Sequence, residues 1–396
     1  MKFSLMRRLD NEVGVPVCHA LGALEWAARR GRKPPPFPEA GRAERILVMK
    51  FLGLGSVVQA VPMLRLLRRR NPNARIVFLT FDSCAPFAEI LGYFDEVRRI
   101  RTSSLLAFAW DSLRAVLWGR RRRFDVSYDL EFFSKYSYIM SYLIDAPVRV
   151  GYFIRLLRHV RLLTHPVPFN PSRHVSEIFL AQLDPESREI PRAEWETPRL
   201  PDEAESEVDR LLRRFGALED ALLIAVNVNS SELSTLRRWP PDHYAELVAR
   251  LSRRYGAAFL FIGQAEDRRY VQEVVAKLAP EVRLLNLAGL TSLQGLLALF
   301  RRVKLVISND SGPLHLAALM GAPTVSFFGP ESGANYGPQG ERHANLDKRL
   351  YCSPCLNVFN FKEFDCPYGV RCLTEIKPEE AYEAACRLIG RVTPAR

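Results

Sequence analysis

Apolar segments alternate with amphipathic ones along this chain, and the alternation occurs in two separate series. In the first series the continuous apolar run RILVMKF (45–51) is typical of a strand buried on both faces of a parallel sheet. SVVQAVPMLRLLRRR (56–70) has the apolar spacing of a helix, and the strand RIVFLTF (75–81) follows it. Regular alternation of this kind predicts an α/β fold, in which helices cover both faces of a parallel sheet.

The second series has the same pattern. It includes ALLIAVNVNSS (221–231), KLVISND (304–310) and PTVSFFGP (323–330), each of which indicates a strand followed by a loop or turn. A stretch rich in proline and charge at 184–206 separates the two series. Two doubly wound domains in tandem would face a central cleft with the carboxyl ends of their strands. We therefore expect an N-terminal extension (1–44), a first domain (45–190), a second domain (207–376) and a C-terminal helix (377–396) that could cross back to the first domain.

The extension is partly apolar and partly basic, and it ends in the proline-rich linker PPPFPEAG. It is either a short helix on a membrane surface or a helix packed on the first domain. The 396 residues carry a net charge of +12, much of it in the arginine runs 65–70, 98–101 and 120–123. Such runs attract an anionic membrane or anionic substrates, or they are simply solvated helix faces. They lack the interleaved aromatic residues of a nucleic-acid-binding surface, which argues against a nucleic-acid partner.

The sequence contains no apolar stretch long enough to span a bilayer and no signal-peptide pattern, so we expect a cytoplasmic protein. Four of the seven cysteines cluster with the spacing C-x2-C-x10-C-x5-C. Four thiolates could hold a structural zinc ion, and the alternative is a set of reduced thiols, because the last spacing is not that of a standard zinc knuckle. These residues are Cys352, Cys355, Cys366 and Cys372.

The segment VISNDSGPLHLAALMGAPTVSFFGP (306–330) carries the most specific signal. Asp310 ends a predicted strand, and Ser311 and Gly312 begin a helix whose first backbone N–H groups have no partner within the helix. The positive end of a helix binds anions, and a diphosphate suits it. His315, one turn into the helix, can point towards the same place. The simpler alternative is that Asp310 caps the helix and His315 packs.

The same segment, with ILVMKFLGLGSVVQAVPMLRLLRRRNPNARI (46–76), RVGY (149–152) and RRWPPDHYAELVARL (237–251), resembles glycosyltransferase family 9, the heptosyltransferase family of lipopolysaccharide core assembly. The resemblance extends over nearly the whole chain after residue 45. It implies a GT-B fold, which consists of two Rossmann-like domains with the nucleotide sugar held mainly by the second. It also implies a nucleotide-diphosphate-sugar donor and no catalytic metal.

Carried over residue by residue, the resemblance places the donor site in the second domain. Arg237 stands where relatives have a phosphate-contacting lysine, and its planar fork can hold a pair of diphosphate oxygens. The loop NVNSS (227–231) matches one near the phosphates, and Glu266, after the turn in FIGQAED, is a candidate ribose or sugar contact. The implied donor-binding residues are Asp310, Ser311, Gly312, Leu314, His315, Arg237, Asn229, Ser230 and Glu266.

The first turn departs from the family pattern. Relatives have Gly-Asp there, and that aspartate is the proposed base, whereas this chain has Gly55 and Ser56 on a loop that also contains Gly53. A serine hydroxyl cannot act as the base at neutral pH, so we expect Ser56 to cap the helix or to contact the acceptor. A carboxylate should come from another strand end. The segment 124–132 carries Glu131, our preferred base, and Asp129, two residues apart and hence on one side of a strand.

These patterns favour an inverting, metal-independent glycosyltransferase that moves a sugar, with heptose from ADP-heptose as the leading candidate, onto a lipid-linked or lipopolysaccharide-core acceptor at the inner membrane. Two alternatives stay open. A GT-B-fold nucleotide-sugar epimerase would need no acceptor. A nucleotide-sugar-binding protein without catalytic activity would bind a donor without turnover.

Overall fold

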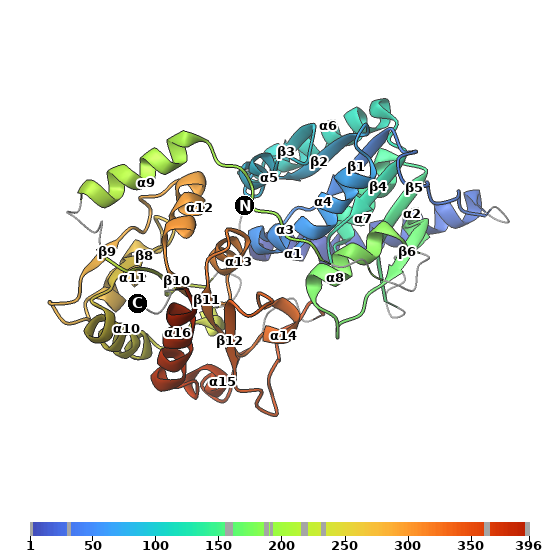
Figure 1. The fold of residues 1–396 in the computed structure, drawn as a ribbon. Helices are drawn as coiled ribbons and strands as arrows, with labels where there is room; N and C mark the ends of the chain where they lie inside the picture. Colours follow the sequence, from blue (N-terminus) through green and yellow to red (C-terminus); the bar gives the residue numbers. More distant parts are fainter. Residues whose placement is uncertain are drawn as a thin grey trace. The chain divides into compact units, whose positions relative to one another are not determined.

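The protein forms two compact units, which meet in sequence between Glu196 and Thr197. The computed structural model describes residues 3–29, 33–154, 161–185, 190, 193–214, 221–230, 235–359 and 365–392. The division falls inside the proline- and charge-rich stretch expected between two domains. Each unit contains its own six-stranded sheet with helices around it (Figure 1). The predicted α/β class with two Rossmann-like domains is confirmed.

The first unit is built on a parallel sheet with the strand order β3-β2-β1-β4-β5-β6. β1 lies in the middle, where both of its faces are covered, which is why its apolar run is continuous. Its last residue, Met49, is opposite Asp129, so the loops after β1 and β4 leave the sheet side by side. The strands are β1 (Arg45–Met49), β2 (Arg75–Phe81), β3 (Glu96–Ile100), β4 (Val126–Asp129), β5 (Val148–Phe153) and β6 (His165–Pro168).

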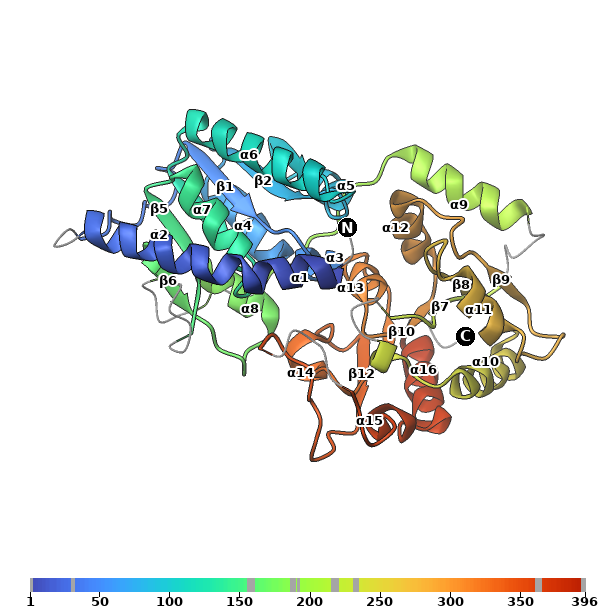
Figure 2. The same ribbon diagram turned by 180° about the vertical axis from the view of Figure 1, so that it is seen from behind.

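Helices cover both faces of this sheet. Seen from behind, α6, α7 and the N-terminal pair α1 and α2 lie in front of the strands (Figure 2), and α7 contacts both α6 and α2. α4 packs against α8. The helices are α1 (Phe3–Glu12), α2 (Gly14–Ala28), α3 (Leu54–Gln59), α4 (Val61–Arg70), α5 (Ala85–Leu91), α6 (Leu105–Arg122), α7 (Lys135–Ile144) and α8 (Val175–Leu180), followed by the 3-10 turn η2 (Ala181–Leu183).

The N-terminal extension is bonded to the first unit by polar contacts. Asp10 of α1 accepts hydrogen bonds from the backbone N–H groups of Lys135 (3.2 Å) and Tyr136 (2.8 Å), which are otherwise unsatisfied donors at the start of α7. On α2, Glu25 Oε1 lies 2.5 Å from Nη2 of Arg149, which is buried on β5. Of the two expectations for this segment, the structure shows the packed helix.

The second unit repeats the architecture with the strand order β12-β11-β10-β7-β8-β9, and its strand pairs are also parallel. Here β10 and β7 are the central strands, so their carboxyl ends lie next to each other. The strands are β7 (Leu223–Asn227), β8 (Ala258–Phe261), β9 (Leu284–Asn286), β10 (Leu305–Asn309), β11 (Thr324–Phe328) and β12 (His343–Asp347).

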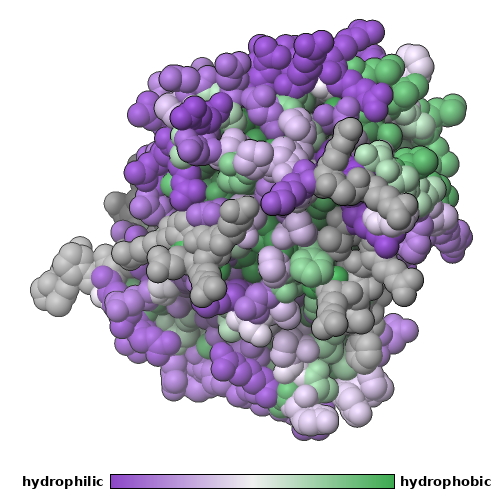
Figure 3. Space-filling view, turned by 90° about the vertical axis from the view of Figure 1, so that its right-hand side faces the viewer, coloured by the Kyte–Doolittle hydropathy of each residue, from purple (hydrophilic) through white to green (hydrophobic). Residues whose placement is uncertain are grey.

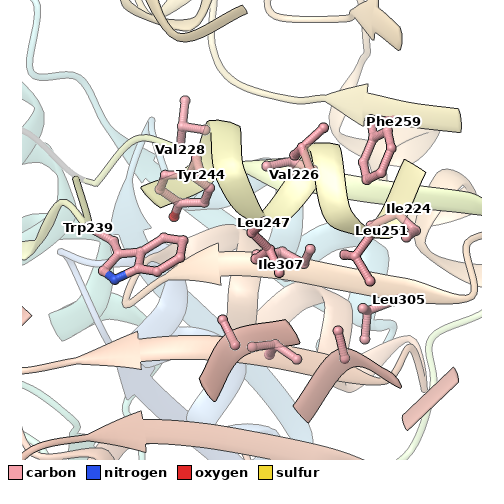
Figure 4. Close-up of a cluster of buried hydrophobic side chains, with 14 of the residues drawn as sticks. Ile224, Val226, Val228, Trp239, Tyr244, Leu247, Leu251, Phe259, Leu305 and Ile307 are labelled. Carbon is pink, nitrogen blue, oxygen red and sulfur yellow. The ribbon is translucent and has the colours of Figure 1, made fainter. Parts of the chain in front are cut away.

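The core of the second unit forms where helices pack on this sheet (Figure 4). Trp239 stacks on Phe327 with ring centroids 4.0 Å apart, and Leu388 and Ile389 of α16 belong to the same core. The sequence left open whether this last helix crosses back to the first domain, and its apolar side chains lie in the second unit. The helices are α9 (Asp202–Arg214), α10 (Pro241–Tyr255), α11 (Arg268–Val275), α12 (Leu293–Arg302), α13 (Gly312–Leu319), α14 (Gly333–Tyr336), α15 (Arg371–Thr374) and α16 (Pro378–Val392), with the 3-10 turn η3 (Thr235–Arg237).

Candidate active site

A buried ion pair stands at the carboxyl end of β10. Asp310 directly follows the strand, and its Oδ2 lies 2.9 Å from Nη1 of Arg237, which ends the 3-10 turn η3. Both side chains are buried. Burial alone would lower the pKa of Arg237, but the negative charges of Asp310 and Glu331 outweigh it and hold that pKa above its ordinary value. Arg237 is therefore a permanent cation, fixed by a carboxylate 73 residues away.

The helix α13 begins immediately beside this pair. Its N-cap residue is Ser311, which makes no capping hydrogen bond through its side chain, and the helix starts at Gly312 with Pro313 in the first turn. His315 Nε2 lies 3.8 Å from Asp310 Oδ1, so the two polar side chains approach each other as the sequence suggested. Leu314, also in the first turn, is fully buried, so its predicted role in donor binding has no exposed group to support it. Arg237, Asp310, Ser311 and His315 thus form one local group.

Two asparagines that the sequence analysis did not single out organise the loops around this group. Asn227, at the end of β7, donates to Ser311 Oγ (2.8 Å) and to Ser308 Oγ (3.0 Å). Asn309, at the end of β10, accepts a hydrogen bond from the Trp239 N–H (2.9 Å) and donates to the Val228 carbonyl (2.8 Å). Each asparagine is a polar residue at the end of a fully buried strand. This position could have identified both from the sequence, because buried polar groups need hydrogen-bond partners.

A second carboxylate joins the group from β11. Glu331 lies just beyond the strand and is buried. Its charge acts on Arg237, and burial together with the charges of Glu331 and Asp310 raises the pKa of Tyr336 on α14 above its ordinary value. Neither Glu331 nor Tyr336 was predicted from the sequence, although Glu331 directly follows the FFGP block. The environment of Arg237 therefore includes two carboxylates.

The remaining donor-side predictions lie along the loops after β7 and β8. Asn229 is buried, accepts a hydrogen bond from the Ser230 N–H (2.9 Å) and donates to the carboxylate of Asp267. Ser231 lies outside the described residues. Glu266 is exposed before α11, and no described hydrogen bond or ion pair connects it with Asp310 or Arg237. The structure thus brings Asn229 and Ser230 to the loop after β7 and leaves Glu266 as a separate surface residue.

In the first unit, a lysine and a glutamate meet at the carboxyl end of β1. Lys50 Nζ donates to Glu131 Oε1 (2.8 Å) and to the Leu52 carbonyl (2.6 Å). The same Oε1 accepts from the backbone N–H groups of Phe51 (2.6 Å) and Leu52 (2.9 Å). Three donors converge on one carboxylate oxygen, and these contacts fix the β1–α3 loop. Across the described residues, no hydrogen bond reaches Oε2 of Glu131.

Asp129 has a different environment, although it lies two residues from Glu131. It is the last residue of β4 and is fully buried, with Ser137 Oγ donating to its Oδ2 (2.6 Å). Burial raises the pKa of Asp129 to about 8. The prediction that a strand extends over 124–132 and orients both carboxylates was wrong, because β4 ends at Asp129 and Glu131 belongs to the following loop. The two carboxylates are adjacent through the Glu131 N–H, which donates to Asp129 Oδ1 (3.0 Å).

The prediction that Ser56 caps a helix was also wrong. α3 begins at Leu54, its N-cap is Gly53, and Gly55 and Ser56 lie within its first turn. Gly53 has φ = 84°, a left-handed conformation that glycine adopts without strain. An added Cβ at Gly53 would meet Ser56 Oγ at 3.3 Å, so the hydroxyl lies over the loop. Among the described residues, the Ser56 hydroxyl has no hydrogen-bond partner.

The clustered cysteines lie near one another but form no recognised ligand set. Burial, followed by the charges of Cys355 and Cys366, raises the pKa of Cys372 to about 12. Within the parts of the chain that the structure describes, no group of three or more His, Cys, Asp or Glu side chains is arranged to hold a metal ion. Structural zinc at Cys352, Cys355, Cys366 and Cys372 thus stays a prediction without support from the geometry.

No helix among the described residues is both long and apolar enough to cross a membrane.

This chain is similar to known heptosyltransferases in sequence. The family model described as glycosyltransferase family 9 (heptosyltransferase) matches residues 120–363. Lipopolysaccharide heptosyltransferase 2 of Escherichia coli strain K12 is 27% identical over 299 residues, covering 73% of this chain and 83% of that protein. Lipooligosaccharide heptosyltransferase 2 of Haemophilus influenzae is 25% identical over 356 residues, covering 87% and 99%.

Solved structures share the fold. A glycosyltransferase family 9 protein from Veillonella parvula superimposes with a TM-score of 0.70 at 21% identity, covering 87% of this chain and 97% of that one. The E. coli ADP-heptose lipopolysaccharide heptosyltransferase II does so with a TM-score of 0.68 at 20% identity, covering 88% and 99%. At these identities the likeness concerns the fold.

Proposed function

This chain belongs to glycosyltransferase family 9, and from that premise we propose that it is an inverting, metal-independent heptosyltransferase of lipopolysaccharide core assembly. As a member of that family it is an enzyme that transfers sugar from a nucleotide sugar. The donor we propose is ADP-heptose and the acceptor a lipid-linked core saccharide at the cytoplasmic face of the inner membrane. The names of the relatives support this choice.

The observation that carries the proposal is the buried Arg237–Asp310 pair beside the start of α13. A carboxylate repels a phosphate, so Asp310 acts on the donor by holding Arg237 in place rather than by touching the diphosphate. The guanidinium and the first N–H groups of α13, from Gly312 onwards, supply the positive charge. They stabilise the ADP that leaves when the bond between the sugar and the diphosphate breaks.

The acceptor hydroxyl attacks the anomeric carbon and must lose a proton, for which we propose Glu131 as the base. Its carboxylate is held in position through Oε1, and we propose that Oε2 takes the proton. Asp129 is fully buried, which makes it a poor partner for an acceptor. We assign an acceptor contact to Ser56, which lies in α3 next to the loop that Glu131 fixes. Asn229, Ser230 and His315 complete the donor side, and Glu266 is a proposed ribose contact.

The donor assignment is tested by titrating ADP and UDP into Arg237→Ala, with Arg238→Ala as a matched control. Arg238 is the next residue, but its guanidinium lies over the Tyr270 ring, 4.2 Å from the centroid. Loss of a charged hydrogen bond to the diphosphate should weaken ADP binding about 10- to 100-fold in Arg237→Ala and little in the control. Equal ADP affinity in all three proteins would refute the placement.

The reaction itself is tested by incubating the enzyme with ADP-heptose and a core acceptor lacking its terminal heptose, with and without EDTA. Transfer that survives EDTA supports the proposal. Conversion of the nucleotide sugar without an acceptor would instead indicate an epimerase. Donor binding without turnover across a panel of acceptors would indicate a binding protein without catalytic activity.

A further inference from the structure

The helix α6 (Leu105–Arg122) packs on the first unit through a face that includes two small residues. Its buried residues are Ala115 and Gly119, and it lies against α7. A Cβ atom added at Gly119 would meet Ile144 Cγ2 at 2.8 Å, so this close approach depends on glycine. Phe108, Val116 and Trp118 are partly buried and pack against the core of the first unit, so α6 already turns one apolar face inwards.

A second set of large apolar side chains on α6 is exposed. Leu106, Trp110, Leu113 and Leu117 are 85%, 57%, 51% and 51% exposed. They recur at intervals of four, three and four residues, which places them on one side of the helix, and we call them the α6 stripe. A surface helix normally turns its apolar side inwards, so this outward stripe is a candidate interaction surface. Figure 3 shows apolar side chains gathered at the upper right of one face, beside hydrophilic ones.

Arginines border the α6 stripe. At 100° per residue, Arg114 and Arg121 lie on one side of it and Arg120 lies on the other. Within the run 120–123, only Arg122 has an ion pair among the described residues, with Glu96 at 3.7 Å.

The other two arginine runs of this unit are matched by acidic side chains. In 65–70, Arg65 and Arg69 pair with Glu194, and Arg68 pairs with Asp95 at 2.5 Å. In 98–101, ion pairs join Arg98 to Glu96, Arg99 to Glu89 and Arg101 to Asp111. The surplus positive charge thus collects at the end of α6, next to the exposed apolar side chains.

We propose that α6 docks the enzyme on an anionic lipid bilayer, lying in the plane of the interface. The α6 stripe would enter the boundary between headgroups and acyl chains, with Trp110 at headgroup depth and the arginines against lipid phosphates. This deepens the proposed function, because a lipid-linked acceptor has to be reached at such a surface.

The positive charge beside the α6 stripe disfavours the binding of a second copy of the chain to it. A two-fold contact through the α6 stripe would bring its bordering arginines close to those of the partner, where like charges repel. An anionic bilayer supplies the opposite charge along the whole helix. The charge pattern therefore favours lipid over self-association.

The full-length protein is to be sedimented with vesicles of phosphatidylglycerol and phosphatidylethanolamine, and with phosphatidylcholine vesicles as the neutral surface. The test variant is Trp110→Ser with Leu113→Ser. The matched control is Leu24→Ser with Trp26→Ser on α2, which removes the same two residue types at comparable exposure. We expect the α6 variant to bind anionic vesicles at least about 10-fold more weakly and the control to bind within about twofold of wild type.

A second pair of variants tests the charge. Arg121→Gln with Arg123→Gln should weaken binding to anionic vesicles roughly fivefold per arginine at low salt. Arg213→Gln with Arg269→Gln, which removes two exposed arginines of the second unit, should have little effect. Binding of wild type that is equal on neutral and anionic vesicles would contradict the role of the arginines.

Failure of this inference is distinguishable from failure of the proposed function, since vesicle binding needs no substrate. ADP affinity should be unchanged in the α6 variant, because no donor residue is touched. The inference is overturned if wild type ignores vesicles, or if the α2 control rather than the α6 variant loses binding. It is also overturned if size-exclusion chromatography shows a wild-type dimer that the α6 variant dissolves while vesicle binding persists.

Discussion

Each unit keeps one cation–carboxylate pair at the carboxyl end of a central strand, and the two pairs are built differently. In the second unit Arg237 is the centre, with the carboxylates of Asp310 and Glu331 acting on it. In the first unit a carboxylate is the centre, and Lys50 with two backbone N–H groups converges on Glu131 Oε1. A fixed cation suits a diphosphate, and a fixed carboxylate suits a proton to be removed. The difference thus supports our proposal that the second unit binds the donor and the first supplies the base.

The largest effect should come from Glu131→Gln. Glutamine keeps the shape and can still accept the loop N–H groups, but it cannot take the acceptor proton. Turnover should fall by about 10²–10⁴, the usual contribution of a positioned base, while ADP affinity is retained. Asp310→Asn is the matched change in the other unit and should weaken ADP binding instead. Wild-type turnover in Glu131→Gln would remove the distinction between the two pairs.

Both pairs should contribute similarly to stability if both are truly buried. Lys50→Met and Arg237→Met each leave a carboxylate without its cation inside the protein, which typically costs about 3–5 kcal/mol of unfolding free energy. The double variants Lys50→Met/Glu131→Gln and Arg237→Met/Asp310→Asn should recover much of that loss. Urea unfolding of these four variants and the wild type measures the loss and the recovery. Wild-type stability of either methionine variant would show that its pair is solvated.

Asp129 should give the first unit a pH dependence. Its pKa is about 8 in the folded protein because of burial, against 3.8 as its ordinary value. Between these values the folded state holds a proton that the unfolded state has lost. Stability therefore falls as pH rises from about 4 to about 8, by up to about 1.4 kcal/mol per pH unit, and is flat above that range.

Urea unfolding at pH 5, 7 and 9 measures this slope. In Asp129→Asn the contribution of Asp129 should disappear, and the remaining pH dependence is the control. An unchanged slope would mean that Asp129 is ionised in the folded protein and that Ser137 and the Glu131 N–H compensate for its burial.

The contrast between the units also shows what sequence can predict. The grouping of Asp310, Ser311 and His315 was predictable because these residues lie in one contiguous strand–helix segment whose residue types fix its geometry. The two Rossmann-like sheets were predictable from periodicity for the same reason. The Lys50–Glu131 pair spans 81 residues and depends on β1 and β4 being neighbours, which no local pattern specifies.

Other features depend on packing rather than on local pattern. The apolar residues of α6 have helical spacing, but the sequence does not say that Phe108 and Trp118 pack inwards while Trp110 and Leu113 stay exposed. Glu331 and Asn309 stand beside apolar strands, and their roles follow from which strands are adjacent in the sheet. The start of α3 was misjudged because Gly53 caps it through backbone conformation, whereas serine is the more common capping residue.

The smallest effect should come from Ser56. Because its hydroxyl caps no helix, Ser56→Ala should change the unfolding free energy by less than about 0.5 kcal/mol and lower turnover only slightly. Ser56→Asp is the informative change, since it puts a carboxylate in the first turn of α3, where the helix dipole favours negative charge. If Glu131 and Ser56 serve the same acceptor, Ser56→Asp should restore part of the turnover lost in Glu131→Gln. Turnover is measured in the double variant Ser56→Asp/Glu131→Gln. Restored turnover would show that a carboxylate at either position can act as the base. An inactive double variant, with Ser56→Asp alone active, would show that Glu131 is needed to hold the loop.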